Sequence, residues 1–128
     1  LSDTTFNNVA TLSYNSRRIE NTMAFINNNF DKNITLADAA KVATMSDVAF
    51  CRFFKLRTGK TFIDTLNEVR IGHASRMLME TTHSINEIAY RCGFNNISNF
   101  NRIFKKKKDC TPKEFRQSYN TTGIRAFI

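Results

Sequence analysis

The chain has 128 residues, of which 41% are hydrophobic, enough for one compact domain or two small domains that share an element. Its single proline and four glycines argue against a sandwich or a barrel with many tight turns and favour helices. A net charge of +8 favours a polyanionic partner, and the absence of any run of 18 apolar residues argues against a membrane-spanning helix.

The chain opens on a polar segment, residues 1–16, with no sustained periodicity, which predicts a linker or a disordered end. From residue 17 onward, Ile19, Met23 and Ile26 recur at helical spacing. The first helix is therefore predicted over residues 17–29.

A helix-turn-helix pattern follows the first helix. Thr35 is a predicted N-cap for a short Ala-rich helix over residues 36–43, and Ser46 for a helix that ends near Arg57. Gly59 supplies the stop signal of this second helix. Two helices separated by so short a turn are typical of helix-turn-helix proteins.

A longer helix and a second pair of short helices come next. Thr61 caps a predicted helix over residues 62–80. Ser84 and Glu87 then form a predicted capping box, and Gly93 ends the short helix that they open.

Two more helices complete the chain. Either Asn95 or Asn96 caps a helix that ends near Lys108, and Thr111 with Pro112 opens a last helix to about residue 118. The predicted fold is all-α, with about seven helices. After the opening segment at residues 1–16, it divides into a first helix-turn-helix unit (residues 17–60), a linker helix (61–80), a second helix-turn-helix unit (81–119) and a tail (120–128).

The two helix-turn-helix units are copies of one pattern. Arg-x-Phe-Lys occurs at Arg52 and again 50 positions later at Arg102, late in the second helix of each pair. In both copies a Thr cap, Thr61 or Thr111, follows six residues after the Lys. The first helices of the two pairs match at an offset of 49 positions, whereas the second helices match at 50. This difference predicts one extra residue in the turn of the second pair.

The second helix of each pair has an apolar stripe of Phe residues and an outward face. Arg can bridge guanine O6 and N7, Asn can pair with adenine, and Val can contact a thymine methyl. The outward residues are therefore candidate DNA contacts: Val48, Cys51, Arg52 and Lys55 in the first copy, and Ser98, Asn99, Asn101, Arg102, Lys105 and Lys106 in the second.

Two other interpretations of these charges stay open. The outward faces can be ordinary solvated surfaces, and Lys105–Lys108 can simply oppose the negative end of a helix. However, residues 97–118 hold seven Lys or Arg and only two acids, an imbalance larger than a helix end needs. We therefore expect phosphate contacts from part of the lysine run.

The chain offers no pattern for catalysis or for a cofactor. His73 and His83 lack partners at metal-ligand spacing, and we expect neither a metal site nor an enzyme. Cys51, Cys92 and Cys110 fit neither a disulfide framework nor a zinc motif, so reduced thiols in a cytoplasmic protein are expected.

The stretch from Ile85 to Phe115, INEIAYRCGFNNISNFNRIFKKKKDCTPKEF, resembles the signature of the AraC/XylS family of transcription regulators. The resemblance implies two helix-turn-helix units joined by a long helix, with reading helices at residues 46–55 and 96–105 that enter neighbouring major-groove segments. Arg52 and Arg102 are then the strongest candidates for base contact. One departure is Thr44, which stands where the first turn often has Gly.

The expected partner is double-stranded DNA, with RNA polymerase as a further candidate and no membrane. Because the chain starts with Leu, we expect it to be a piece of a longer protein, and we expect this piece to be monomeric. The resemblance implies that dimerisation and effector functions lie in a separate, N-terminal part. A basic helical module that binds RNA or an anionic membrane is the alternative. A protein-interaction adaptor is a third hypothesis, which would need an exposed apolar patch.

Overall fold

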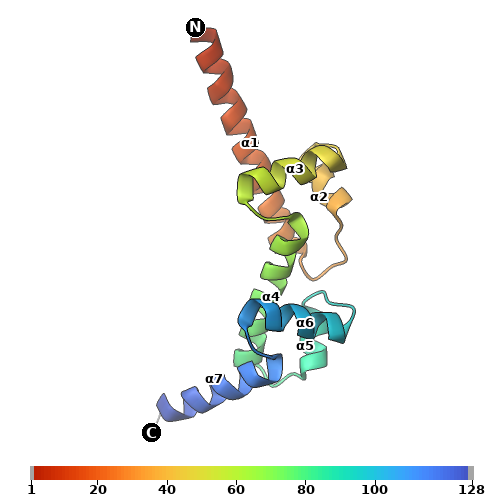
Figure 1. Ribbon diagram of the computed structural model, residues 1–128, viewed down its shortest axis with the longest axis vertical. Coiled ribbons are helices and arrows are strands. Elements are labelled where there is room, and N and C mark those ends of the chain that lie inside the picture. The colour runs from red at the N-terminus through yellow and green to blue at the C-terminus, as the bar shows by residue number, and fades with distance from the viewer. Residues whose placement is uncertain (1, 127–128) are drawn as a thin grey trace. The chain divides into compact units, whose positions relative to one another are not determined.

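The computed structural model describes the backbone of residues 2–126 and the side chains of residues 10–120. This part of the chain forms seven helices, which confirms the all-α prediction: α1 (Ser2–Asn29), α2 (Leu36–Val42), α3 (Asp47–Thr58), α4 (Phe62–Glu80), α5 (Ile85–Arg91), α6 (Ile97–Lys108) and α7 (Pro112–Ala126) (Figure 1).

The helices form two compact units that interleave along the chain. Unit 1 combines α1 with residues 34–65, and unit 2 combines residues 30–33 with the chain from residue 66 onward. The division falls within α4, after Thr65, and not at either end of that helix.

In unit 1 the predicted caps are present. The Thr35 hydroxyl accepts from the Asp38 amide at 3.2 Å, and the Asp38 carboxylate accepts from the Thr35 amide at 2.9 Å, which makes a complete capping box on α2. The Ser46 side chain caps α3. Phe50 and Phe54 are fully buried and lie with Phe62 in one aromatic cluster, with ring centroids 5.5 to 6.3 Å apart.

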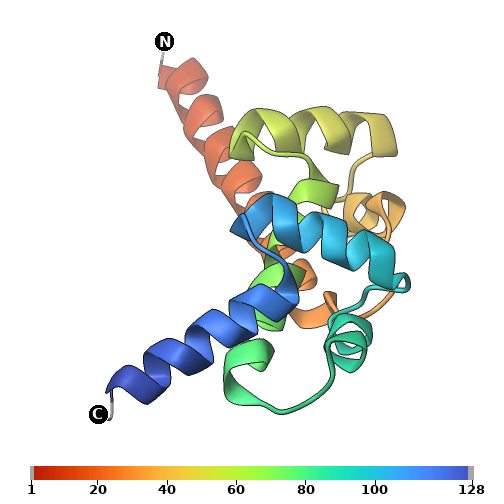
Figure 2. The ribbon, with the colours of Figure 1, turned by 60° about the horizontal axis from the view of Figure 1, so that its bottom comes forward.

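Unit 2 repeats this arrangement with a larger core. Asn96, and not Asn95, caps α6. Phe100 and Phe104 are fully buried. The ring centroids of Phe100 and Phe94 are 5.1 Å apart, and those of Phe104 and Phe115 are 5.6 Å apart. Figure 2 shows α5 joined to one end of α6 by a short turn, with α7 leaving the other end. The Phe stripe thus holds α6 against the unit and leaves its other face outward.

The same backbone motif ends the first helix of each pair. At α2 the Thr44 amide donates to Lys41 O and the Met45 amide to Ala40 O. At α5 the amides of residues 93 and 94 make the equivalent bonds to the carbonyls of residues 90 and 89. Both are Schellman motifs, which require one left-handed residue. Thr44 (φ 56°) fills that position in unit 1 and Gly93 (φ 94°) in unit 2.

Three predictions about local structure were wrong. The helix α1 begins at Ser2, so residues 1–16 do not form the predicted linker or disordered end over the part described. The helix α7 continues to Ala126 and takes up most of the predicted tail at residues 120–128, because a lone Gly123 weakens a helix without ending it. Ser84 caps α5, but the Glu87 carboxylate pairs with His83 and Arg91 instead of completing the capping box.

Candidate nucleic-acid interface

The outward face of α3 carries the residues that the sequence indicated. Opposite the buried Phe50 and Phe54, the side chains of Val48, Cys51, Arg52 and Lys55 are all exposed. None of these four side chains belongs to the core of unit 1, so all of them are accessible to a partner.

This face of α3 is more apolar than the sequence suggested. Val48 is 68% exposed and Leu56 is 85% exposed, and they flank Arg52 at a spacing of four residues on either side. A shallow apolar depression lies beside them, where Leu36 and Cys51 meet Val48 and Arg52. Sequence analysis missed Leu56, although its position one turn beyond Arg52 was a usable signal.

The outward face of α6 is polar. Its exposed side chains are Ser98, Asn99, Asn101, Arg102, Lys105 and Lys106. Ile97 is also exposed, at 38%, and lies at the border between the two faces. The guanidinium of Arg102 donates to the Asn99 Oδ1 at 2.7 Å, which fixes the direction of the Arg side chain before any partner binds.

The two faces differ at equivalent positions. Counting back 50 residues, Ala49 stands where unit 2 has Asn99, so the first copy lacks the amide that orients Arg102. Leu56 likewise stands where unit 2 has Lys106. The first face therefore presents Arg52 and Lys55 among apolar groups, and the second presents an oriented Arg among amides and cations.

The lysine run at the end of α6 is not uniform. Lys107 Nζ lies 3.9 Å from Glu68 Oε1 on α4, and only 17% of the Lys107 side chain is exposed. Lys105, Lys106 and Lys108 are exposed. Lys107 is thus turned toward the unit, and three members of the run are left for an external anion.

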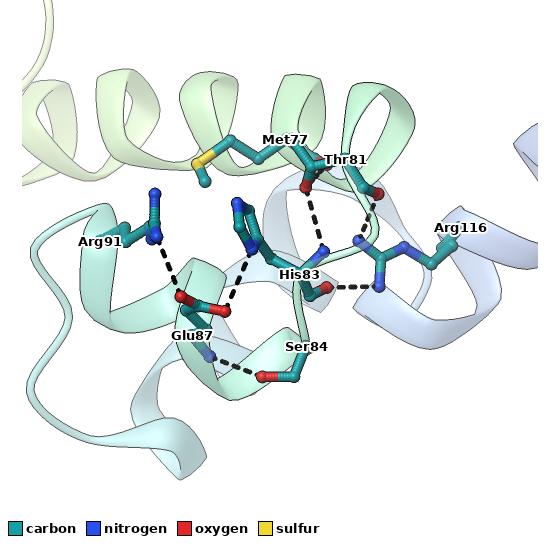
Figure 3. A network of polar contacts seen from close by, with 7 residues as sticks. All are labelled: Met77, Thr81, His83, Ser84, Glu87, Arg91 and Arg116. Carbon is teal, nitrogen blue, oxygen red and sulfur yellow. Dashed lines mark hydrogen bonds and ion pairs between the residues drawn. The ribbon is translucent and has the colours of Figure 1, made fainter.

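Arg116 of α7 holds the link between α4 and α5 (Figure 3). Its guanidinium donates to the carbonyls of Leu78, Thr81 and His83 at 3.1, 3.1 and 2.7 Å. These carbonyls lie at and beyond the end of α4, where a helix leaves its last acceptors unsatisfied. Arg116 therefore has a structural role within unit 2, and its charge is largely used there.

Arg70 does the same for the segment before α2. Its side chain donates to Phe30 O at 2.7 Å and to Lys32 O at 2.8 Å. Burial lowers the pKa of this guanidinium from its usual value, and the nearby Asp31 opposes that shift. His73 stacks on the Phe30 ring at 3.9 Å, which gives this histidine a packing role.

The remaining candidate chemistry is sparse. The three cysteines are free thiols, and burial raises the pKa of Cys92 to about 11, so that this thiol stays protonated at neutral pH. Within the described residues no three His, Cys, Asp or Glu side chains are grouped as metal ligands. In the same part of the chain, no helix has the length and apolar character needed to cross a bilayer.

Comparison with known proteins gives matches over most of the chain. A family profile described as a helix-turn-helix domain matches residues 39–118. An uncharacterized HTH-type transcriptional regulator in the cgkA 5' region of Pseudoalteromonas carrageenovora is 35% identical over 103 residues, 80% of this chain and 61% of that protein. The HTH-type transcriptional activator RhaS of Enterobacter sp. strain 638 is 32% identical over 106 residues, 83% of this chain and 38% of that protein.

Among solved structures, the DNA-binding domain of AdpA in complex with a target DNA superposes with a TM-score of 0.75 at 26% identity, covering 79% of this chain and 91% of that one. The chain therefore spans less than two thirds of the two regulators named above and nearly the whole of this DNA-binding domain. Because the profile covers more than half of the chain, the chain belongs to the AraC/XylS family of helix-turn-helix transcription regulators, which are not enzymes.

Proposed function

We propose that this chain binds double-stranded DNA in a sequence-specific way, with α3 and α6 as its two reading helices. One observation carries the proposal: Arg52 and Arg102 occupy the same register on two helices whose opposite faces are buried by Phe residues, and both are exposed. The solved AdpA complex supports it, because that protein of the same fold holds a target DNA. The net charge of +8 suits a phosphate backbone.

In unit 2 the chemistry of recognition is hydrogen bonding. Arg102, oriented by Asn99, is suited to the O6 and N7 acceptors of guanine, and Asn101 to the N6 and N7 of adenine. Lys105 and Lys106 follow on the same exposed surface and are placed for phosphates.

In unit 1 the chemistry is different. Val48 and Leu56 offer apolar surface on either side of Arg52, and few groups on α3 can form hydrogen bonds with base edges. The methyl group at C5 of thymine is the apolar feature of the major groove. We expect unit 1 to prefer T·A pairs next to the base contacted by Arg52.

One chain then contacts two consecutive major-groove segments, roughly 10 bp apart. Because the reading faces of the two units differ, the preferred site is asymmetric and not palindromic. A single chain on such a site corresponds to a one-to-one complex.

Selection of bound sequences from a random duplex pool tests the proposal. We expect an asymmetric site with two conserved blocks, and binding that survives competition by tRNA, anionic vesicles and scrambled duplex. Arg102→Ala should cost about 1 to 3 kcal/mol on the selected site and relax the choice of one base pair in a single block. Lys105→Ala is the matched control, since loss of a phosphate contact weakens binding to all duplexes alike. Equal competition by tRNA or by vesicles would overturn the proposal.

Replacement of thymine by deoxyuridine, which removes only the C5 methyl, tests the division of labour between the units. We expect uracil in the block of unit 1 to weaken binding and uracil in the block of unit 2 to have little effect. The variant Leu56→Lys, which copies the residue of unit 2 and leaves Val48 in place, should reduce the sensitivity to uracil. Equal sensitivity in both blocks would contradict methyl recognition by unit 1.

A further inference from the structure

The N-terminal half of α1 reaches the first helix-turn-helix turn. The phenol oxygen of Tyr14 lies 3.2 Å from Thr44 Oγ1, across 30 residues of sequence within unit 1. The guanidinium of Arg18, one turn further along α1, lies 4.1 Å from the centroid of the Tyr14 ring. The contact with Thr44 ties α1 to the turn between α2 and α3, and Arg18 supports the Tyr14 ring from within the same helix.

Thr44 needs such support because of its backbone. Its φ of 56° is in the left-handed region, where a β-branched residue is an outlier. The equivalent residue of unit 2 is Gly93, which adopts a positive φ without this steric cost. Thr44 also lies two residues before Ser46, the cap of α3, so the conformation at residue 44 sets where the first reading helix begins.

The hydrogen bonds give the contact a direction. The Thr44 hydroxyl donates its one proton to the carbonyl of Ala43 at 2.6 Å. The Tyr14 hydroxyl must therefore be the donor to Thr44 Oγ1. The side chain of Thr44 is thus held from both sides, by its own helix end and by α1.

We propose that Tyr14 is a positioning residue for DNA recognition by unit 1: its hydroxyl holds Thr44 in the left-handed conformation and so fixes the start of the reading helix α3. This inference rests on the proposed function, since it assigns a role in the same recognition. It also gives a role to the N-terminal half of α1, whose residues have low helix propensity. Tyr14 acts through Thr44 and is not itself a base contact.

A double-mutant cycle of Tyr14→Phe and Thr44→Gly tests the proposal in two ways. Hydrogen exchange on the free chain follows the Met45 amide, which bonds to Ala40 O in the turn. Tyr14→Phe should speed exchange of this amide about two- to tenfold, the effect of one lost hydrogen bond. In the Thr44→Gly background the same substitution should change nothing, because glycine holds the turn without help.

DNA binding is the second readout. Tyr14→Phe should weaken binding about two- to tenfold, with base interference lost only in the block read by unit 1, and Thr44→Gly should restore it. Tyr119→Phe is the matched control, because Tyr119 of α7 is 45% exposed and Tyr14 is 48% exposed. We expect no change from it in either readout.

The two readouts separate this inference from the proposed function. Unchanged Met45 exchange in Tyr14→Phe would overturn the inference, as would an equal effect of Tyr14→Phe with and without Thr44→Gly. Loss of binding spread over both blocks would also overturn it. Coupling in the exchange data from a chain that binds no duplex would instead refute the proposed function, and with it the role of Tyr14 in recognition.

Discussion

Units 1 and 2 meet the same backbone requirements with different residues. Each has two helix ends that need a left-handed residue: Thr44 and Gly59 in unit 1, Gly93 and Asp109 in unit 2. Glycine therefore stands at the second position of one unit and at the first position of the other. A positive φ alone does not decide where glycine is required, because Asp and even Thr can adopt it when contacts compensate.

The surroundings of the two glycines explain the difference. A Cβ on Gly93 would lie 2.5 Å from Phe30 O and 2.8 Å from Arg70 Nε, whereas nothing lies within 4 Å of a Cβ on Gly59. Gly93 is needed because the carbonyl held by Arg70 passes directly over it. Gly59 is needed only for its backbone conformation.

The largest expected effect separates these two roles. Gly93→Ala should destabilise unit 2 by about 3 kcal/mol, from left-handed strain together with the clash against Phe30 O. Gly59→Ala, the control, should cost about 1 kcal/mol, because only the strain applies. Urea unfolding of both variants measures the difference. Equal losses would show that the close approach at Gly93 relaxes easily.

A second comparison concerns two arginines near the link between α4 and α5. Arg116→Ala should destabilise unit 2 by about 2 kcal/mol, since three carbonyls near the end of α4 lose a charged donor. Arg91→Ala is the control within the same network. Arg91 forms an exposed ion pair with Glu87, and such pairs contribute little to the free energy of unfolding. Thermal unfolding followed by circular dichroism checks both. A loss from Arg91→Ala as large as that from Arg116→Ala would argue against the carbonyl cluster as the main contribution.

A third test removes from α6, or adds to α3, the Asn side chain three residues before the Arg, which distinguishes the two helices. Asn99→Ala frees Arg102, so binding to the selected DNA should weaken by about 0.5 to 1.5 kcal/mol, the entropy of one more mobile side chain. Ala49→Asn places the amide three residues before Arg52 and should strengthen binding by up to the same amount. Fluorescence anisotropy titrations measure both. Opposite signs support orientation by the amide, and a loss from both variants would contradict it.

The smallest expected effect is the pH dependence of stability from two capping boxes, the one on α2 and one on α7. In the latter the Thr111 amide donates to Glu114 Oε1 at 3.2 Å and the Glu114 amide donates to Thr111 Oγ1 at 3.1 Å. Hydrogen bonds from the Thr35 backbone and hydroxyl lower the pKa of Asp38, and those of Thr111 lower the pKa of Glu114. A carboxyl whose pKa is lower in the folded state stabilises the fold above its unfolded pKa, and this contribution is lost as pH falls through the acidic range. Urea midpoints at neutral and acidic pH should therefore converge slightly in Asp38→Asn and Glu114→Gln, and unaltered pH dependence would contradict this.

The sequence was sufficient for features that depend on neighbours along the chain. Capping residues at Thr35, Ser46 and Ser84 and the buried Phe stripes of α3 and α6 follow from local spacing, and the structure has them where they were predicted. The AraC/XylS resemblance, carried by a short ordered motif, was likewise confirmed.

Features that depend on distant partners could not be predicted. The first half of α1 is poor in helix formers, and its contact at Tyr14 is with a residue 30 positions away. The sequence does not distinguish Lys107 from its neighbours in the lysine run, because the partner that sets it apart, Glu68, lies on α4. Whether the outward residues of α3 and α6 contact bases stays a prediction, because exposure defines a surface and not its partner.

The interleaving of the units has a consequence for dissecting the protein. Residues 30–33 belong to unit 2, although they lie between the two segments of unit 1 in the chain. A fragment that starts at residue 66 would lack the Phe30 ring that stacks on His73 and the carbonyls that Arg70 holds. No single cut yields two intact halves. The fragment that starts at residue 66, which keeps His73 and Arg70, should become native-like only when a peptide containing residues 30–33 is supplied, as in fragment complementation.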